Sequence, residues 1–202
     1  MPKADEQTSP RTRAVRDNRR HQWEKDRVHK PPAVRSEAGA TEHETGLTPG
    51  DLVFRARYRE TGASRELAEI FGVPEGTALL ERRYRTRHTA ETAPFGLVTS
   101  YLPRSLVTPN PDLLDASKEP WPGGTHHQLS TVGVELDRIE ERFTARPPAP
   151  EEARELELPP GTPVILLRKT SYDTGGRVVE VSYVVLPGDR TELLFTTALE
   201  RW

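Results

Sequence analysis

The closing segment of the chain, residues 161–199, most narrowly limits what this sequence can fold into. It reads GTPVILLRKTSYDTGGRVVEVSYVVLPGDRTELLFTTAL. Residues 163–171 and 178–186 are rich in Val, Ile and Leu, and Asp173 to Gly176 between them supply turn residues. Two β-branched runs joined by such a turn predict an antiparallel hairpin. We therefore expect two neighbouring strands of a sheet here.

The composition excludes several classes of protein. Only 34% of the 202 residues are hydrophobic and 30% are charged, so part of the chain is expected to lie outside a core. The absence of cysteine excludes disulfides, thiol catalysis and thiolate metal sites. No apolar run approaches the roughly 20 residues that span a bilayer, and the N-terminus lacks the apolar stretch of a signal peptide. We expect a cytoplasmic protein with no membrane partner.

The first 48 residues differ in character from the rest. They contain the Pro31-Pro32 pair and a small, polar run from Ser36 to Gly46, which is the composition of a linker. Residues 1–36 carry an excess of five positive charges, and the remainder carries an excess of seven negative charges. We predict a basic, Pro-containing linker or partly ordered arm over residues 1–48, followed by one folded domain over 49–202. Direct contact of this arm with DNA phosphates is the alternative to a solvated linker.

Periodicity and punctuation predict the order of elements in the folded domain. We expect a strand from Leu52 toward Gly62 and a helix over 65–71, capped by Ser64 and stopped by Gly72. Further strands are expected over 77–86, 95–102 and 134–145, with helices beginning near Gly124 and over 151–156. Ala14 to Arg27 is compatible with a short amphipathic helix or turn. This order predicts an α+β fold with a mainly antiparallel sheet.

Three separated strings carry a family resemblance. The hairpin contains a GxPVxxxxRxxYDxxGxxVE pattern, formed by Gly161, Pro163, Val164, Arg168, Tyr172, Asp173, Gly176, Val179 and Glu180. ARPPAPEEARELELPPG spans residues 145–161, and PGGTHHQL spans 122–129. Together they resemble the UTRA domain, the effector-binding domain of GntR/HutC-type bacterial transcription regulators. Arg19, Arg20 and Trp23 are similar to the segment that follows the DNA-binding domain in actinobacterial members.

The resemblance implies a fold and a function. The fold is chorismate lyase-like, with a six-stranded, mainly antiparallel sheet and flanking helices. The function is to bind a small anionic metabolite as effector and to form a homodimer, whose arrangement shifts on ligand binding and so changes DNA binding. DNA would be contacted only through a winged helix-turn-helix, for which this chain shows no matching segment.

Arg83 and Arg85 are the leading candidates for effector binding. They lie two apart on a predicted strand and therefore project from one face, as a clamp for phosphate or carboxylate. The resemblance matches them to an RxR pair that grips the effector's phosphate in sugar-phosphate-sensing relatives. An exposed strand edge kept soluble by its charges is the alternative.

Five further residues are candidates for the same pocket. Thr125 and His127 correspond to a Ser and a Tyr that accompany the arginines in those relatives, and both can still form hydrogen bonds. Ser100 lies near the end of the strand expected to pair with Arg83. Glu140 and Arg142 share one face of their strand, although a cross-strand ion pair is the alternative. Pro187 and Thr191 replace the family's ligand-side Arg and Tyr, so the expected ligand is an anionic metabolite other than an amino-sugar phosphate.

No catalytic residue, metal ligand set or cofactor is predicted. The sequence has no GxxxxGK[ST], GxSxG or HExxH motif, and the adjacent His126 and His127 cannot both face one site from a helix. The chain is therefore predicted not to be an enzyme. Two alternatives stay open: a chorismate lyase-like enzyme using Glu140 as acid or base, and a stand-alone metabolite-binding protein without DNA binding.

Overall fold

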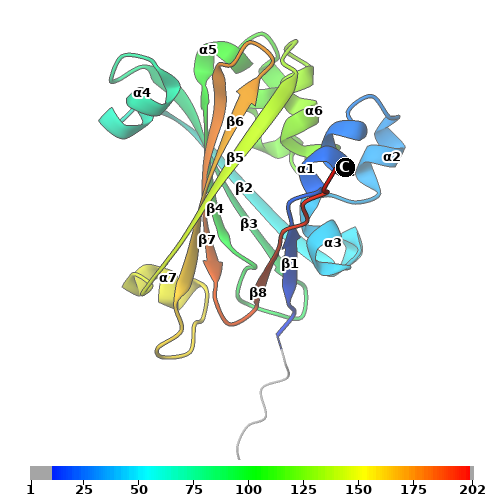
Figure 1. The fold of residues 1–202 in the computed structure, drawn as a ribbon, viewed down its shortest axis with the longest axis vertical. Coiled ribbons are helices and arrows are strands. Elements are labelled where there is room, and N and C mark those ends of the chain that lie inside the picture. Colours follow the sequence, from blue (N-terminus) through cyan, green and yellow to red (C-terminus); the bar gives the residue numbers. More distant parts are fainter. Residues whose placement is uncertain (1–10, 201–202) are drawn as a thin grey trace, which may run out of the picture.

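The computed structural model describes residues 11–200 and shows one six-stranded sheet with helices on both sides (Figure 1). Its strands are antiparallel throughout and lie in the order β2-β3-β4-β7-β6-β5. Their bounds are β2 Leu52–Gly62, β3 Ala78–His88, β4 Leu97–Pro103, β5 Leu136–Arg146, β6 Val164–Asp173 and β7 Val178–Pro187. The predicted α+β fold with a six-stranded antiparallel sheet is confirmed. A separate parallel pair joins β1 (Ala14–Asp17) to β8 (Thr191–Leu194), which the sequence did not predict.

The helices divide between the two faces of the sheet. They are α1 Arg20–Asp26, α2 Pro32–Ser36, α3 Ala40–Thr45, α4 Arg65–Phe71, α5 Arg104–Val107, α6 Gly124–Ser130 and α7 Pro150–Glu155, with 3-10 turns at Pro49–Asp51, Pro111–Leu114 and Ala116–Lys118. In Figure 1, α4 and α7 lie on one side of the sheet, and α1 to α3 with α6 lie on the other. No helix among the described residues is long and apolar enough to cross a membrane.

The closing hairpin forms as its sequence predicts. Asp173 accepts hydrogen bonds at Oδ1 from the backbone N–H groups of Gly175 and Arg177, at 3.0 and 2.9 Å. Gly176 follows with a φ of 77°, a left-handed conformation that glycine adopts without the strain of a side chain. The turn therefore fixes the register in which β6 pairs with β7. That register places the carboxylate of Glu180 inside the protein, where only 1% of the residue is exposed.

The two faces of the sheet are packed differently. On the back face, defined by Leu79, Glu81, Arg83 and Arg85 of β3, Leu67 and Phe71 of α4 form an apolar cluster with Leu79 and Val181. At the other end of this face, Leu156 at the end of α7 packs with Leu97 and Val164. On the front face, defined by Leu80, Arg82, Tyr84 and Thr86, an apolar cluster fills one end around Leu102, Val107 and Leu129. The other end of the front face is covered by the N-terminal segment.

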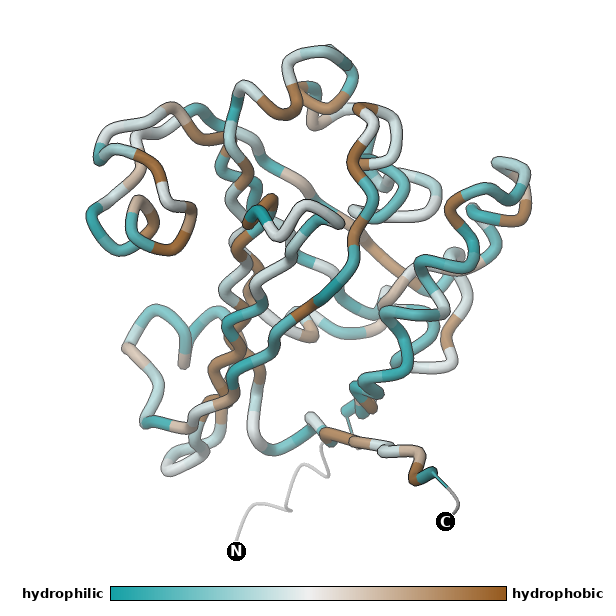
Figure 2. The backbone as a smooth tube through the Cα atoms, turned by 45° about the horizontal axis from the view of Figure 1, so that its top comes forward, coloured by the Kyte–Doolittle hydropathy of each residue, from teal (hydrophilic) through white to brown (hydrophobic). Residues whose placement is uncertain are grey.

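That segment, residues 11–48, is called the arm below. It contains β1, α1, α2 and α3, and its first helix, RHQWEKD, is hydrophilic along its length (Figure 2). The one buried residue of α1 is Arg20, which pairs with Glu44 of α3 and lies 3.4 Å from Glu141 of β5. A short amphipathic helix or turn was expected over Ala14 to Arg27, and the structure forms a strand and then a helix there. Ion pairs hold the arm where apolar contacts are too few to order it.

Candidate functional site

A cavity of about 600 Å³ lies between the front face of the sheet and the arm. Its floor consists of strand residues that include Tyr84, Val98, Val184 and Leu167, which are register partners across β3, β4, β7 and β6. Lys169 and Ser182 continue the floor one row further along. This volume is in the range of pockets that enclose small organic molecules.

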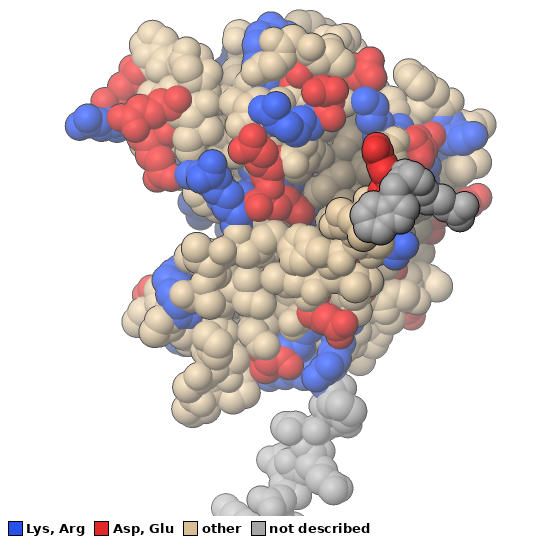
Figure 3. Space-filling view, in the orientation of Figure 1, with Lys and Arg blue, Asp and Glu red and all other residues tan. Residues whose placement is uncertain are grey.

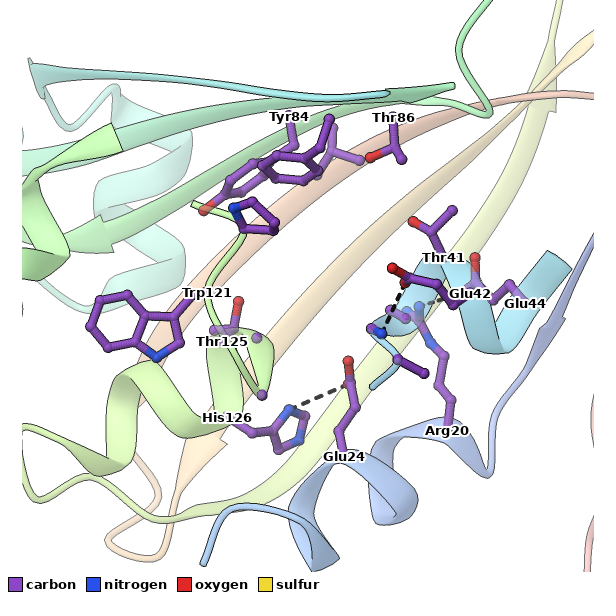
Figure 4. Close-up of a pocket in the computed structure, with 18 of the residues that line it drawn as sticks. Arg20, Glu24, Thr41, Glu42, Glu44, Tyr84, Thr86, Trp121, Thr125 and His126 are labelled. Atoms are coloured by element: carbon purple, nitrogen blue, oxygen red, sulfur yellow. Dashed lines mark hydrogen bonds and ion pairs between the residues drawn. The ribbon is translucent and has the colours of Figure 1, made fainter. Parts of the chain in front are cut away.

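The walls come from α6 and the arm. Figure 4 shows Thr125 and His126 on α6, Trp121 just before it, and Glu24 reaching up from α1 toward the space beneath Tyr84 and Thr86. The arm contributes a set of lining residues from all three of its helices: Arg20, Trp23, Glu24, Arg27, Arg35, Thr41, Glu42 and Glu44. Two lining glycines, Gly123 and Gly124, stand at the N-terminal end of α6 and have positive φ values of 93° and 60°. Positive and negative side chains are interspersed around the hollow in Figure 3.

A buried ionic network supports the floor. Arg82 is 2% exposed and donates hydrogen bonds to Glu180, Ser100 and Gln128 at 2.8, 2.9 and 2.6 Å. Lys169 lies 3.0 Å from the second oxygen of Glu180. Burial alone would raise the pKa of Glu180, but the charges of Lys169 and Arg82 hold it well below its usual range. The network is therefore ionised at neutral pH and fixes the floor in one geometry.

Glu119 organises a second polar cluster at the cavity wall. Its carboxylate accepts hydrogen bonds from the Tyr58 hydroxyl, from Tyr84 at 3.0 Å, from Gln128 at 2.9 Å and from the backbone N–H of Trp121 at 2.6 Å. Burial raises the pKa of Tyr58 to about 12. The negative charge of Glu119 adds to this rise, and the positive charge of Arg82 opposes it. Burial likewise raises the pKa of Tyr84 well above its usual value. Both phenols are therefore neutral donors, and the carboxylate has its acceptors occupied.

His126 and Glu24 meet where α6 faces α1. The Nδ1 of His126 lies 3.4 Å from Oε2 of Glu24, and the imidazole is 6% exposed. Burial lowers the pKa of His126 to about 4, so the ring is neutral at pH 7. Burial would raise the pKa of Glu24, but the positive charges of protonated His126, Arg20 and Lys169 lower it instead. A carboxylate thus stands beside a neutral imidazole at the cavity wall.

The two leading candidates, Arg83 and Arg85, lie on the back face and do not line the cavity. They do share one face of β3, as the alternation predicted. Arg83 is paired with Glu81 at 2.7 Å, and Arg85 with Glu155 of α7. The cavity side of β3 is formed instead by Arg82, Tyr84 and Thr86, which alternate with Arg83 and Arg85 along the strand. A shift of one residue exchanges the two faces of a strand. Because Leu79 to Arg82 are all buried, this part of the strand has no alternation of buried and exposed residues that would indicate which face holds the cavity.

Three of the other predicted residues lie at or near the cavity. Thr125 lines it, and Ser100 lies beneath its floor, donating a hydrogen bond to Glu180 at 2.7 Å. His127 turns away from the cavity and accepts a hydrogen bond at Nδ1 from the indole N–H of Trp121 at 2.8 Å. It therefore holds a lining residue in place rather than lining the cavity itself.

Glu140 and Arg142 lie elsewhere. Both are on the back face of β5, their carboxylate and guanidinium atoms are 4.0 Å apart, and Arg138 lies 3.4 Å from Glu140. Neither lines the cavity, and their side chains are 38% and 69% exposed. They form an exposed pair along one strand, rather than the cross-strand ion pair that was the alternative. Among residues 11–200, no group of three or more His, Asp or Glu is arranged to hold a metal ion.

Sequence reasoning missed the arm's contribution most completely. Trp23 lines the cavity, with the centre of its ring 4.6 Å from that of His43 and 4.2 Å from the Arg27 guanidinium. Glu24 gave no signal, because a short charged helix has no periodicity that distinguishes a cavity wall from a solvated linker. The available sign was the similarity of Arg19, Arg20 and Trp23 to a segment of actinobacterial family members.

Comparison with known proteins assigns the family. Residues 45–192 match the UTRA domain. The chain belongs to the UTRA domain family. An HTH-type transcriptional regulator of Streptomyces coelicolor is 33% identical over 129 residues, which cover 63% of this chain and 47% of that protein. The UTRA chain therefore matches about half the length of this relative.

Solved structures support the fold. A GntR-family transcriptional regulator superimposes with a TM-score of 0.70 at 24% identity, over 96% of this chain and 72% of that one. PhnF from Mycobacterium smegmatis superimposes with a TM-score of 0.65 at 18% identity, over 96% of this chain and 74% of that one. The chorismate lyase-like fold expected from the resemblance is thus confirmed for this UTRA domain. The match to the family begins at residue 45, so α1 and α2 and most of α3 lie outside it.

Proposed function

We propose that this UTRA domain is the sensing and dimerisation part of a GntR/HutC-like transcription regulator of the cytoplasm, and that its effector occupies the cavity beneath the arm. The observation that carries the proposal is the composition of that cavity. A rigid sheet forms the floor, and a polar segment held by ion pairs forms the roof. A ligand that contacts both would stabilise one arrangement of arm and sheet over others.

The arm connects ligand binding to its output in this proposal. Because β1 pairs with β8 and α3 packs beside it, a change in the arm also changes the last strand of the chain. In a homodimer, such a change would alter the spacing of attached DNA-binding domains and so their affinity for an operator. DNA contact through the arm itself is less favoured, because several of its basic side chains are engaged with the protein: Arg11, Arg16, Arg19, Arg20 and Lys25.

An acidic group on the effector is supported by two arginines of the arm. Arg27 donates hydrogen bonds to the carbonyls of Val34 and Ala38, and Arg35 donates to the carbonyl of Pro122. Within the described residues neither guanidinium has a carboxylate at ion-pair distance, so each brings an uncompensated positive charge to the cavity wall. We assign to them the anion-binding role that the sequence suggested for Arg83 and Arg85.

We further propose that the domain binds its ligand without chemical turnover. The lyase alternative required Glu140 as acid or base beside an arginine clamp, and Glu140 lies on the back face of the sheet, outside the cavity. Incubation of the protein with chorismate and chromatography for 4-hydroxybenzoate tests this part of the proposal. Product formation above the uncatalysed rate would overturn it.

A ligand screen tests the cavity itself. Thermal-shift screening of a metabolite library is expected to yield compounds that raise the melting temperature of the wild-type protein. Thr86→Trp, which fills the cavity from its floor, should abolish these shifts, whereas Thr144→Trp on the exposed back face of β5 should leave them intact. Ligand shifts that persist in Thr86→Trp would place the effector elsewhere.

The dimer is tested separately. Light scattering after size-exclusion chromatography should give twice the chain mass, and small-angle scattering should show a change in the dimer's shape when a ligand found in the screen is added. A monomer at all concentrations, or a dimer whose scattering is unchanged at ligand saturation, would contradict the proposed output while leaving the binding site untouched.

A further inference from the structure

The charged groups around the cavity differ in whether the protein itself compensates them. Arg20 and Arg16 are paired with Glu44, and Lys169 is paired with Glu180 beneath the floor. Among the carboxylates, Glu119 accepts four hydrogen bonds, and Glu42 accepts one from the backbone N–H of Gly39 at 2.9 Å. These groups are committed to holding the walls in place.

Glu24 is the exception among the lining carboxylates. Its closest Arg, Lys or His nitrogens among the described residues are Nδ1 of His126 at 3.4 Å and Nδ1 of His21 at 3.9 Å, both longer than an ordinary N–H···O hydrogen bond. Because His126 is neutral at pH 7, it supplies no counter-charge. Figure 4 shows the carboxylate pointing from α1 into the open centre of the cavity.

The start of α6 leaves room beside this carboxylate. A Cβ added to Gly124 would lie 3.8 Å from Oε1 of Glu24, in ordinary contact distance, so the glycine keeps the space next to that oxygen open. The side chain of Glu24 is 17% exposed, and it lines the cavity. Arg20 and Lys169 stabilise the charge of Glu24 from beyond ion-pair distance, so the carboxylate is ionised. Its oxygens keep acceptor sites that a cationic donor on a ligand can fill.

Aromatic rings line the same cavity as this carboxylate. Trp23 comes from the arm, Trp121 from the segment before α6, and Phe54 and Tyr84 from β2 and β3. The Phe54 and Tyr84 rings are 5.7 Å apart, and the Trp121 indole is fixed by its hydrogen bond to His127. Flat rings of this kind favour a cyclic apolar body and also stabilise a nearby cation through their π faces.

We propose that Glu24 binds a protonated amine on the effector, whose cyclic body lies among Trp23, Trp121 and Tyr84. This inference rests on the proposed function, because it concerns the same cavity. Glu24 would bind the amine, and Arg27 and Arg35 would bind an acidic group. The effector is therefore a cyclic compound that carries both groups. Glu24 belongs to the arm and lies outside residues 45–192, which match the UTRA domain.

A matched set of indoles tests the proposal by titration calorimetry at pH 7. Tryptamine carries an amine, 3-ethylindole is neutral, and indole-3-propionate carries an acid on the same ring. Tryptamine is expected to bind about tenfold or more tightly than 3-ethylindole, as a charge-assisted hydrogen bond in a desolvated site would give. Glu24→Gln should remove this preference without changing the affinity for 3-ethylindole more than about twofold.

Two variants separate the role of Glu24 from damage to the fold. Glu24→Asp keeps the charge on a shorter side chain and should retain a preference for tryptamine, at reduced affinity. Glu151→Gln removes an exposed carboxylate of α7, 76% exposed and far from the cavity lining, and should bind all three indoles as the wild type does. Far-ultraviolet circular dichroism of each variant checks that the protein is folded.

The outcomes separate two questions: whether Glu24 binds an amine, and whether the cavity is the effector site. Equal binding of tryptamine and 3-ethylindole, or an amine preference that survives in Glu24→Gln, would overturn the assignment of Glu24 while leaving the cavity as the effector site. Failure of all three indoles to bind would also overturn the proposed ligand class. The proposed function would then be tested only by the thermal-shift screen with Thr86→Trp. An amine preference that disappears only in Glu24→Gln is the supporting result.

Discussion

The sheet and the arm enclose one cavity but are stabilised by different interactions. The sheet is held by β-ladders and by apolar clusters on both faces, where residues such as Leu79 and Leu129 have no exposed surface. The arm is held by Arg20 and its carboxylate partners, with few apolar contacts. Apolar burial is insensitive to pH and is strengthened rather than screened by many salts, whereas ion pairs depend on both. The two regions should therefore respond separately to the same perturbation. A sensor whose arm moves relative to the sheet requires this independence.

The largest effect is expected from breaking the ionic network under the floor. Glu180→Ala leaves Arg82 and Lys169 buried without a carboxylate, and removal of one partner of such a group costs about 3–5 kcal/mol. Urea unfolding followed by circular dichroism measures the loss. Glu151→Ala on exposed α7 is the matched control and should change stability by less than about 0.5 kcal/mol. Equal effects of the two substitutions would mean that the floor does not depend on this network.

Acidification should destabilise the contact between α6 and the arm. The pKa of His126 is lowered to about 4, while an imidazole in the unfolded chain titrates near about 6.5. Between these values the unfolded chain binds more protons, so stability present above pH 6.5 is lost as the pH falls to about 4, by on the order of 2–3 kcal/mol. Glu24, His21, Lys169 and Glu180 also face this ring, and the lowered pKa values of Glu24 and Glu180 add a loss of the same sign at still lower pH.

Unfolding by urea at a series of pH values measures this dependence. His126→Asn should flatten the slope between pH 6.5 and 4, whereas His29→Asn, at an exposed position of the arm, should leave the slope unchanged. A slope that is the same in wild type and His126→Asn would contradict the assignment of the pH dependence to His126.

Arg20→Ala tests whether the arm can open alone. The substitution leaves Glu141 without its guanidinium and Glu44 with Arg16 alone. The loss is limited by the free energy of local opening, so global stability should fall by only about 1–2 kcal/mol. Hydrogen exchange measured by mass spectrometry should increase over residues 11–46 and remain unchanged in β6 and β7. Increased exchange across the whole sheet would show that arm and sheet unfold as one unit. Lys30→Ala, an exposed arm residue, provides the comparison.

The smallest effect is expected on the back face. Arg83→Ala combined with Arg85→Ala removes two partly exposed guanidinium groups, while the buried Glu81 keeps its pair with Arg59. Stability should therefore change by less than about 1 kcal/mol. Binding of any ligand found in the thermal-shift screen should be unchanged, because neither side chain lines the cavity. Loss of ligand binding in the double variant, measured by calorimetry, would move the effector site to the back face.

The sequence by itself determined the sheet, its hairpin and its family. Alternating β-branched strands, the Asp173 turn and the capped helix after Ser64 each depend on interactions between residues near in sequence, so a local pattern was enough to predict them. Arg83 and Arg85 were correctly placed on one face of a strand for the same reason. Thr125, which the family resemblance suggested as a pocket residue, lines the cavity.

The tertiary structure alone decided which face holds the cavity and what covers it. The choice between Arg82 and Arg83 depends on strand partners and helices distant in sequence, and a shift of one residue reverses it. The arm's order depends on Arg20 reaching Glu141, which lies more than a hundred residues away. A charged segment becomes a cavity wall only when the fold brings its counter-charges into reach, because attraction between charges decays with distance and does not depend on sequence separation.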